Sequence, residues 1–316
     1  MPELPEVETT VSGLNSVLPG LKITGVWSDF HKKTKHGHKE NIKNIGYLKS
    51  FKKEVVGKNI LNVKRRGKNI LINLSGGKTI LAHMKITGHF LYGKYEKTYN
   101  QQLTINSKKK KVKEKWIPLE KGSLNDPFNR FIHVVFSLSN GKHLVFSDMR
   151  KFGKIILVET KKLSHSPHLA HLGPEPLEKK FNYKEFVARL LLRPRGKIKT
   201  VLMDQTVMAG IGNIYSDEML WRAGIHPETK VCDMSYVKLK SLYGAMKNVL
   251  KKGIDLGGAS ISDYRNVFGE RGHFQEKHNV YQKKGEKCGK CGCGGIIKRL
   301  TIGGRSAHFC STHQKI

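Results

Sequence analysis

The sequence predicts an α+β protein in which an N-terminal helix and an antiparallel β-sandwich precede a helical C-terminal domain and a short cysteine-containing hairpin. Three observations lead to this prediction. Short apolar runs rich in β-branched residues, separated by glycine-containing turns, fill residues 21–158. After a segment with two prolines at residues 171–176, the apolar spacing becomes helical. The last 29 residues hold four of the five cysteines.

The individual elements follow from the apolar spacing. A first helix begins near Pro5 and ends by Gly20, because its apolar residues share one face: Val7, Val11, Leu14 and Leu18. The clearest strands are expected at residues 69–74, 79–83, 132–138, 143–147 and 154–158. Helices are expected at 181–192, 198–204, 213–223 and 235–256.

Two Lys-rich stretches, residues 31–53 and 94–121, interrupt the predicted sandwich. They have the composition of mobile surface insertions, helical in part, that either contact phosphates or are simply solvated loops. The resulting organisation is a sandwich domain at 1–160, a linker at 161–180, a helical domain at 181–275 and a terminal hairpin at 276–316.

The charge of the chain indicates its partner. Its 316 residues include 58 Lys and Arg against 25 Asp and Glu, a formal charge of +33. Such a charge repels itself unless a polyanion neutralises it, which favours nucleic acid first and an anionic membrane surface second. The sequence has no apolar run of about 18 residues and no basic head followed by an apolar stretch, so we expect a soluble intracellular protein that is neither membrane-spanning nor secreted.

The cysteines at the C-terminus have metal-ligand spacing. Two residues separate Cys288 from Cys291, and two separate Cys310 from His313, with 18 residues between the two pairs. Two such knuckles on a hairpin make a closed tetrahedral site, which predicts one structural zinc ion bound by Cys288, Cys291, Cys310 and His313. Cys293 is an alternative to Cys291 in the first knuckle, and free thiols in a polar tail are the other interpretation.

The N-terminus has the composition of a nucleophilic site. Removal of Met1, which is usual before a small residue, would leave Pro2 with a secondary amine. An α-amine titrates near 8, so part of it is unprotonated at neutral pH and can attack an aldehyde-like carbon. Glu3 and Glu6 supply nearby carboxylates for proton transfer. Many chains begin Met-Pro, so a plain helix start is the alternative.

A series of motifs resembles the formamidopyrimidine-DNA glycosylase branch of the Fpg/Nei family, bifunctional enzymes of base excision repair. The motifs run in order from residue 1 to residue 315: residues 1–9 (MPELPEVET), 65–68 (RRGK), 83–88, 148–153 (DMRKFG), 171–177, 203–205 (MDQ), 210–215 (GIGNIY), 223–227 and the cysteine hairpin. The resemblance implies a helix-two-turns-helix motif around residues 210–214, a zinc-finger hairpin, and damaged double-stranded DNA as the partner of a monomeric enzyme.

The resemblance also assigns catalytic roles. It implies that Pro2 attacks C1′ of the damaged nucleoside, displaces the base and forms a Schiff base that undergoes β- and δ-elimination. Glu3 matches the acid/base carboxylate, and Glu6 a carboxylate near the sugar. Lys68 matches the lysine that binds phosphates flanking the lesion, and Arg305 the phosphate-binding arginine on the zinc hairpin. A lysine near a turn or an arginine at a hairpin tip is otherwise an ordinary solvated charge.

Further positions match the DNA-binding surface of the family. An enzyme that takes a base out of the stack needs side chains to fill the void, and Ile86, Arg150 and Phe152 match the family's three fillers. Asn213 matches the residue that opens a helix behind a Gly-x-Gly turn, where free N–H groups favour anions. Lys199 is expected to add a nearby charge. Residues 260–274 match the lesion-recognition loop, with residues 269–272 at its tip.

The chain departs from the family pattern at a few positions. Ile86 replaces the usual methionine, His313 replaces the usual fourth cysteine, and the spacing of 18 between the knuckles is two longer than usual. The leading hypothesis is a DNA glycosylase and AP lyase that removes oxidised purines such as 8-oxoguanine and formamidopyrimidines. Alternatives are a Nei-like enzyme for oxidised pyrimidines, a catalytically silent zinc-containing DNA-binding protein, and an RNA-binding or ribosome-associated protein. The compartment stays open between cytoplasm or nucleoid, nucleus and viral factory.

Overall fold

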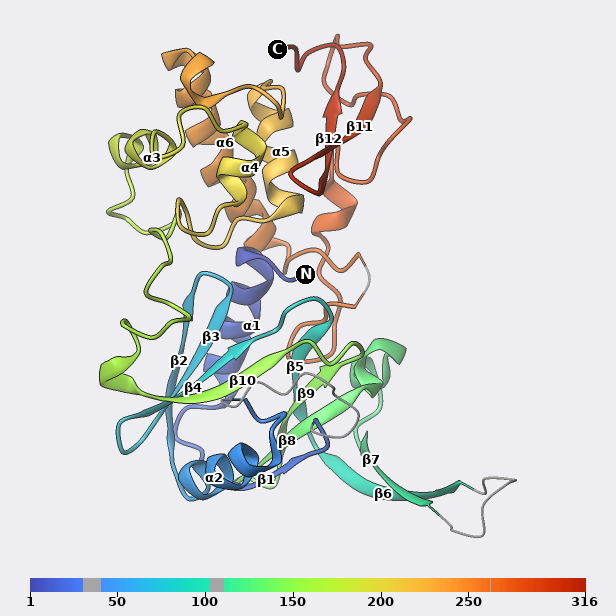
Figure 1. Ribbon diagram of the computed structural model, residues 1–316. Coiled ribbons are helices and arrows are strands. Elements are labelled where there is room, and N and C mark those ends of the chain that lie inside the picture. The colour runs from blue at the N-terminus through green and yellow to red at the C-terminus, as the bar shows by residue number, and fades with distance from the viewer. Residues whose placement is uncertain (31–40, 103–110, 262) are drawn as a thin grey trace.

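The computed structural model describes residues 1–30, 41–102, 111–261 and 263–316. In Figure 1 the chain forms two lobes, with the β-sandwich below and the helices and terminal hairpin above, and the N-terminus lies between them. Two four-stranded antiparallel sheets build the lower lobe. Their strands, in sheet order, are β1 (Ile23–Ser28), β8 (Ile132–Leu138), β9 (His143–Asp148) and β5 (Gly88–Gly93), and then β10 (Lys154–Glu159), β4 (Lys78–His83), β3 (Asn69–Leu74) and β2 (Ile60–Arg66).

The strand prediction is confirmed, because each expected run is a strand whose bounds differ by no more than one residue. The core between the sheets is aromatic. Phe146 is fully buried, with its ring 4.9 Å from that of Phe90 and 6.1 Å from that of Phe30. These rings come from β9, β5 and the segment after β1, and those three strands all belong to one sheet. They share a core cluster with Ile72, Ile80 and Ile155 of the other sheet, so they fill the space between the two sheets.

Helix α1 (Leu4–Val17) closes one end of the sandwich core. Its predicted apolar face is confirmed, since Val7, Val11, Leu14 and Leu18 are all buried. The helix begins with a capping box in which the carboxylates of Glu3 and Glu6 each accept a backbone N–H. Pro5 lies in the first turn, where its missing N–H costs nothing.

The prediction for the Lys-rich stretches needs a correction. The stretch at 31–53 contains the start of helix α2 (Ile45–Val55), while residues 31–40 lie outside the described part of the chain. The described residues of the stretch at 94–121 are mostly strand and not helix: β6 (Tyr95–Gln102) pairs antiparallel with β7 (Lys111–Pro118), and the pair projects from the lower lobe in Figure 1. Residues 103–110 also lie outside the described part of the chain. The base of the pair packs on the outer face of a sheet, where the rings of Trp27 and Trp116 lie 5.9 Å apart. In these strands lysines alternate with Tyr, Trp and Ile, so the overall composition is Lys-rich although one face is apolar. Composition alone therefore did not indicate the strands.

The upper lobe is helical, as predicted. Its helices are α3 (Tyr183–Leu190), α4 (Ile198–Met203), α5 (Asn213–Ala223) and α6 (Tyr236–Asp255), and its hairpin is β11 (Ile297–Ile302) with β12 (Arg305–Cys310). Short 3₁₀ helices lie at Ser123–Asn125, Pro127–Arg130, Thr160–Lys162, Val231–Asp233 and Phe274–Lys277. In the described part of the chain, no helix has the length and apolar character needed to cross a membrane.

The segment after α6 returns to the sandwich. The N–H of Tyr92 donates to the carbonyl of Val267 at 2.7 Å, and Arg265 forms an ion pair with Asp126 at 2.9 Å. Val267 is buried in the sandwich core, so the loop that follows α6 is attached to both lobes. This loop is the expected lesion-recognition segment at 260–274, of which residue 262 lies outside the described residues.

Two phenylalanines allow a matched test of the core. We expect Phe146→Ala to lower the free energy of unfolding by about 3–5 kcal/mol, because the ring leaves a cavity between the two sheets. Phe152→Ala removes an aromatic ring of the same size that is 47% exposed, so its effect should stay within about 0.5 kcal/mol. Urea unfolding followed by tryptophan fluorescence measures both. Equal losses would contradict the packing described for Phe146.

Candidate active site

The N-terminal arm is bound to the first turn of α5. The Leu4 N–H donates to the Gly210 carbonyl at 3.0 Å. The carboxylate of Glu3 accepts the N–H groups of Ile214 at 2.9 Å and Tyr215 at 3.4 Å. Sequence reasoning expected the start of this helix to attract an anion, and the anion that lies there is Glu3 itself, only 3% exposed.

Glycine at position 212 makes this contact possible. A Cβ at Gly212 would lie 2.3 Å from the carboxyl carbon of Glu3, closer than atoms in van der Waals contact allow. A Cβ at Gly210 would likewise lie 2.8 Å from that of Leu4. The two glycines of the Gly-x-Gly turn therefore let the N-terminal arm pack against the backbone of the turn, and they would let a ligand approach the turn as well.

Glu6 fixes the arm to two further segments. One carboxylate oxygen accepts the Glu3 N–H at 2.8 Å, and the other accepts the Tyr215 hydroxyl at 2.6 Å and the Ala259 N–H at 2.7 Å. Burial, and then the charge of Glu3, raise the pKa of Glu6, while these hydrogen bonds act in the opposite direction. With both oxygens engaged, Glu6 holds α1, α5 and the start of the loop after α6 together.

A cavity of about 150 Å³ opens beside Pro2. Most of its lining side chains are apolar or aromatic, which suits a flat organic group. The lining residues are Met1, Pro2, Glu6, Ile86, Ile214, Ala259, Ile261, Tyr264, Tyr281 and Gln282. Sequence reasoning found Pro2, Glu6 and Ile86 in this set. Tyr264 lies in the loop at 260–274 that the resemblance had indicated, although it was not named there. Sequence reasoning missed Tyr281 and Gln282, because nothing in the local sequence shows that these residues return to the N-terminus.

Lys68 lies at the same junction. It is 7% exposed, and its ammonium donates to the Ile211 carbonyl at 2.9 Å. Burial lowers the pKa of Lys68, and the nearby Arg305 lowers it further, whereas Glu3 and Glu6 act to raise it. The turn that Lys68 contacts leads into Asn213, which bonds to Ser306 next to Arg305, so the tip of the terminal hairpin lies on the same side of the molecule.

The turn that carries Lys68 is held by the linker. Glu175, buried in the linker segment, accepts the Gly67 N–H at 2.5 Å and forms an ion pair with Arg66 at 3.0 Å. Arg65 contacts the same carboxylate and also pairs with Glu8 on α1 at 2.5 Å. Lys68 is thus positioned by contacts from both lobes.

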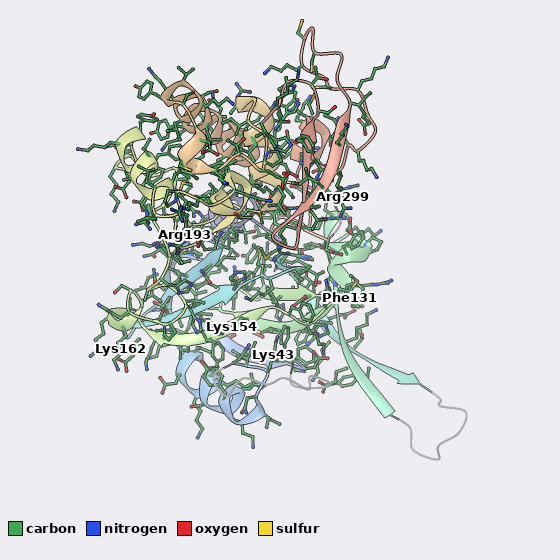
Figure 2. The ribbon with its side chains drawn as sticks, turned by 45° about the horizontal axis from the view of Figure 1, so that its top comes forward. Lys43, Phe131, Lys154, Lys162, Arg193 and Arg299 are labelled. Carbon is green, nitrogen blue, oxygen red and sulfur yellow. The ribbon has the colours of Figure 1, made fainter. Side chains whose placement is uncertain are left out.

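A second cavity, of about 340 Å³, adjoins Lys68 and is lined by basic groups. Its titratable side chains are Lys68, His83, Lys85, Lys154, His168 and His171, and no acidic residue lines it within the part of the chain that the structure describes. Figure 2 labels Lys154 in the sandwich lobe, below the helical lobe. Such a cavity attracts an anion. Apart from Lys68, sequence reasoning did not single out these residues, because single histidines and lysines on strands carry no spacing signal.

The three expected void fillers lie on two neighbouring turns. Ile86 is 38% exposed and Phe152 47% exposed, and the Arg150 guanidinium lies 4.5 Å from the centre of the Phe152 ring. The buried carboxylate of Asp148 joins the turns, because it accepts the Thr87 hydroxyl and, at 2.7 Å, the Gly153 N–H. Exposed apolar groups on so rigid a support favour insertion into a ligand over packing in a core.

Asn213 and Arg305 come from different elements that meet at the hairpin. The Asn213 amide donates to the Ser306 hydroxyl at 3.1 Å. Arg305 is exposed directly after the Gly303-Gly304 turn that joins β11 to β12. The predicted set of Pro2, Glu3, Lys68, Asn213 and Arg305 is therefore assembled around the start of α5.

The prediction that Lys199 contributes a charge to the DNA surface is wrong. Lys199 is fully buried, and its ammonium donates to the Asn213 carbonyl at 2.9 Å, the Ser216 hydroxyl at 2.9 Å and Asp217 at 2.6 Å. Burial lowers the pKa of Lys199, against the effect of Asp217. The other Asp217 oxygen accepts the backbone N–H of His308 at 3.0 Å, so the pair ties α4 and α5 to the hairpin.

The metal-ligand prediction also needs a correction at Cys291. Four side chains gather with their ligand atoms within 4.8 Å of one another: Cys288, Cys293, Cys310 and His313. Cys291 is exposed and lies outside this group. Gly292 and Gly294 have left-handed backbone on either side of Cys293, which turns its sulfur inward in place of that of Cys291. The spacing from Cys293 to Cys310 is then 16 residues.

The four donors form a closed set. The Nδ1 atom of His313 lies 3.3 Å from the Cys293 sulfur and 3.6 Å from that of Cys288. Its Nε2 atom lies 3.1 Å from the Trp221 carbonyl, which orients the ring so that Nδ1 faces the sulfurs. Three thiolates and an imidazole at these separations suit a soft or borderline metal ion in tetrahedral coordination.

His83 makes the free energy of unfolding of the protein depend on pH. Its Nδ1 accepts the Lys85 N–H at 2.9 Å, and burial with nearby lysine charges lowers the pKa of His83 to about 3. In an unfolded chain the imidazole titrates near 6.5. Below that pH the unfolded state binds a proton that the folded state does not, so the free energy of unfolding falls as pH drops from about 6.5 to about 3.

We expect His83→Asn, which keeps an acceptor for Lys85, to remove this contribution. Its free energy of unfolding should decrease less than that of the unsubstituted protein between pH 7 and 5, by up to about 1.4 kcal/mol per pH unit. Urea unfolding at both pH values tests this, and carboxylate titration cancels in the comparison. Parallel pH profiles would show that His83 is not held neutral.

Comparison with known proteins agrees with this geometry. Residues 1–155 match the family described as formamidopyrimidine-DNA glycosylase N-terminal domain, and residues 172–265 match the formamidopyrimidine-DNA glycosylase H2TH domain. The chain is 39% identical over 316 residues to the formamidopyrimidine-DNA glycosylase of Pelotomaculum thermopropionicum, covering 100% of both chains. It is 33% identical to that of Bacillus subtilis, covering 99% of each.

Solved structures give the same result. A complex of Lactococcus lactis Fpg with DNA containing an abasic site is 29% identical, with a TM-score of 0.78 over 99% of this chain and 100% of that one. A MutM complex with DNA containing carbocyclic 8-oxo-G is 30% identical, with a TM-score of 0.77 and full coverage of both chains. With its arm, basic cavity and hairpin assembled around α5, the chain belongs to the formamidopyrimidine-DNA glycosylase family of base excision repair enzymes.

Proposed function

We propose that this chain excises oxidised purines from double-stranded DNA and then cleaves the abasic site, with Pro2 as the nucleophile. The observation that carries the proposal is the position of Pro2 and Glu3 at the start of α5. Next to them lie a largely apolar cavity that suits a nucleobase and a second cavity lined by basic side chains. The enzyme acts as a monomer inside the cell, where its DNA is, with a catalytic unit at 1–160, a linker at 161–180, a DNA-binding helical unit at 181–275 and a zinc hairpin at 276–316.

The reaction requires removal of Met1. The lone pair of the Pro2 amine then forms a bond to C1′ while the bond from C1′ to the base nitrogen breaks, and the base leaves with that electron pair and a proton. The Pro2 nitrogen then donates its lone pair to C1′ while the C1′–O4′ bond breaks and O4′ takes up a proton, which opens the sugar ring and leaves an iminium. The iminium draws electrons from C2′, so loss of a C2′ proton expels the 3′ phosphate, and a second elimination expels the 5′ phosphate. Glu3 transfers protons in these steps.

The remaining residues bind and distort the duplex. Lys68, Asn213 and Arg305 bind phosphates around the lesion, and the basic cavity extends that track. Ile86, Arg150 and Phe152 fill the void that the extruded nucleotide leaves. Relatives of known structure were solved with DNA containing Fapy-dG, carbocyclic 8-oxo-G or an abasic site, which supports the same substrates here.

One structural zinc ion completes the proposal. Cys288, Cys293, Cys310 and His313 would hold it, and the ion would hold the β11–β12 hairpin so that Arg305 faces the DNA. The closed donor set leaves no position for a substrate, so no chemical step involves the metal.

Borohydride trapping tests the catalytic proposal. Untagged protein with Met1 removed, checked by mass spectrometry, is incubated with duplexes containing 8-oxoguanine opposite cytosine, thymine glycol or an abasic site. We expect a covalent adduct on the 8-oxoguanine duplex, and Glu3→Gln should slow its formation by about 10²-fold or more. Pro2→Gly should also reduce it, because the secondary amine is lost.

The other outcomes separate the alternatives. Adducts on thymine glycol alone would indicate a Nei-like preference for pyrimidines, and adducts on the abasic site alone would indicate a lyase without this base specificity. Absence of any adduct would favour a catalytically silent DNA-binding protein.

Two cysteine variants test the metal assignment. We expect Cys293→Ser to lose bound zinc and weaken DNA binding, because one of four ligands is removed. Cys291→Ser makes the same chemical change two residues away and should keep one zinc per chain. Elemental analysis of the purified proteins measures the zinc content. Loss of zinc from Cys291→Ser, with zinc retained by Cys293→Ser, would restore the original ligand prediction.

A further inference from the structure

Backbone strain is concentrated at the proposed active site. Among the described residues, the non-glycine residues with positive φ are Lys85 at 58°, Lys151 at 55° and Gln282 at 61°. Lys85 precedes Ile86 and Lys151 precedes Phe152, so two of the three support proposed void fillers. Gln282 lines the cavity beside Pro2. Side chains in this conformation are strained and persist where the surrounding structure and function require them.

The turn that carries Gln282 is rigidly held. Its ends are joined by the Lys283 N–H, which donates to the Val280 carbonyl at 3.2 Å. The buried carboxylate of Glu218 on α5 accepts the backbone N–H groups of Asn279, Val280 and Tyr281, each within 3.0 Å of one of its oxygens. At the third position of such a turn, glycine would adopt the positive φ without strain. The glutamine therefore needs an explanation from its side chain.

Among the described lining residues, Gln282 is exposed and has hydrogen-bonding groups that stay available. Both oxygens of Glu6 are engaged, and the Tyr264 hydroxyl donates to the Glu6 carbonyl at 2.9 Å. The Gln282 amide has no hydrogen bond to any residue in the described part of the chain. A carboxamide presents a donor and an acceptor side by side, which is the pattern that pairs with the edge of a nucleobase.

We propose that Gln282 is a specificity-determining residue that reads the edge of the extruded base. This inference rests on the proposed function. Guanine presents two acceptors, N7 and O6, along its major-groove edge. Oxidation at C8 places a hydrogen on N7, so the edge becomes a donor beside carbonyl acceptors. The Gln282 oxygen accepts from N7–H while its NH₂ donates to a neighbouring carbonyl. Undamaged guanine presents acceptors at both N7 and O6, so the amide can bond to it only through its NH₂ group, and the hydrogen bond to the Gln282 oxygen is lost.

The experiment compares two reactions of each variant. Single-turnover excision of 8-oxoguanine requires base reading, whereas borohydride trapping on a preformed abasic site does not. Gln282→Met keeps the side-chain bulk without hydrogen bonds, and Gln282→Gly removes the side chain and relieves the positive φ. Lys283→Met makes a similar change one residue later, outside the cavity lining, and should leave the ratio of the two rates unchanged.

We expect both Gln282 variants to excise 8-oxoguanine about tenfold more slowly, the effect of losing a hydrogen bond, while trapping on the abasic site keeps its rate. Gln282→Gly should also unfold at a temperature no lower than that of the unsubstituted protein, which excludes a folding defect. Unchanged excision, or an equal loss in both reactions, would overturn the role of Gln282 and leave the proposed function standing. If the unsubstituted protein reacts with neither duplex, the proposed function itself fails.

Discussion

The ion-to-helix contact between Glu3 and the start of α5 is the interaction on which the site depends. A buried carboxylate is stable only with hydrogen-bond donors, and the first turn of a helix supplies free N–H groups and a favourable dipole. Here those donors belong to Ile214 and Tyr215, in the lobe opposite the sandwich. The contact therefore holds the two lobes together and sets the position of Pro2. Gly212 is required because any side chain there would displace Glu3.

Buried carboxylates that accept hydrogen bonds from other segments occur at several places in the molecule. Each of four further acidic side chains is buried and accepts hydrogen bonds from a segment distant in sequence: Asp148 from the turns of Ile86 and Phe152, Glu175 from the turn of Lys68, Asp217 from the hairpin, and Glu218 from the turn of Gln282. The few acids of a strongly basic chain thus serve as internal anchors. The consequence is that several anions are withdrawn from the surface, and the cations that remain there favour binding to a polyanion.

These anchors explain why the residues that we propose to contact DNA can be strained and exposed at once. Ile86, Phe152 and Gln282 lie on or beside residues with positive φ, yet each turn is held by a buried carboxylate. Because these side chains are already held in place, less conformational entropy is lost when they bind a ligand. The strain in the free protein is therefore offset by a smaller entropic cost of binding.

The sequence by itself determined the α+β class, the approximate bounds of five helices, five strands of the sandwich and the family, because apolar periodicity and motif order are local signals. It also predicted that Pro2, Glu3, Lys68, Asn213 and Arg305 form one functional set. Only the tertiary structure decided that Lys199 is buried against Asp217, that Cys293 replaces Cys291, and that Gln282 reaches the cavity beside Pro2. These outcomes depend on which distant groups meet. The sequence does not show whether a lysine faces solvent or a buried carboxylate, because this depends on how distant segments pack together.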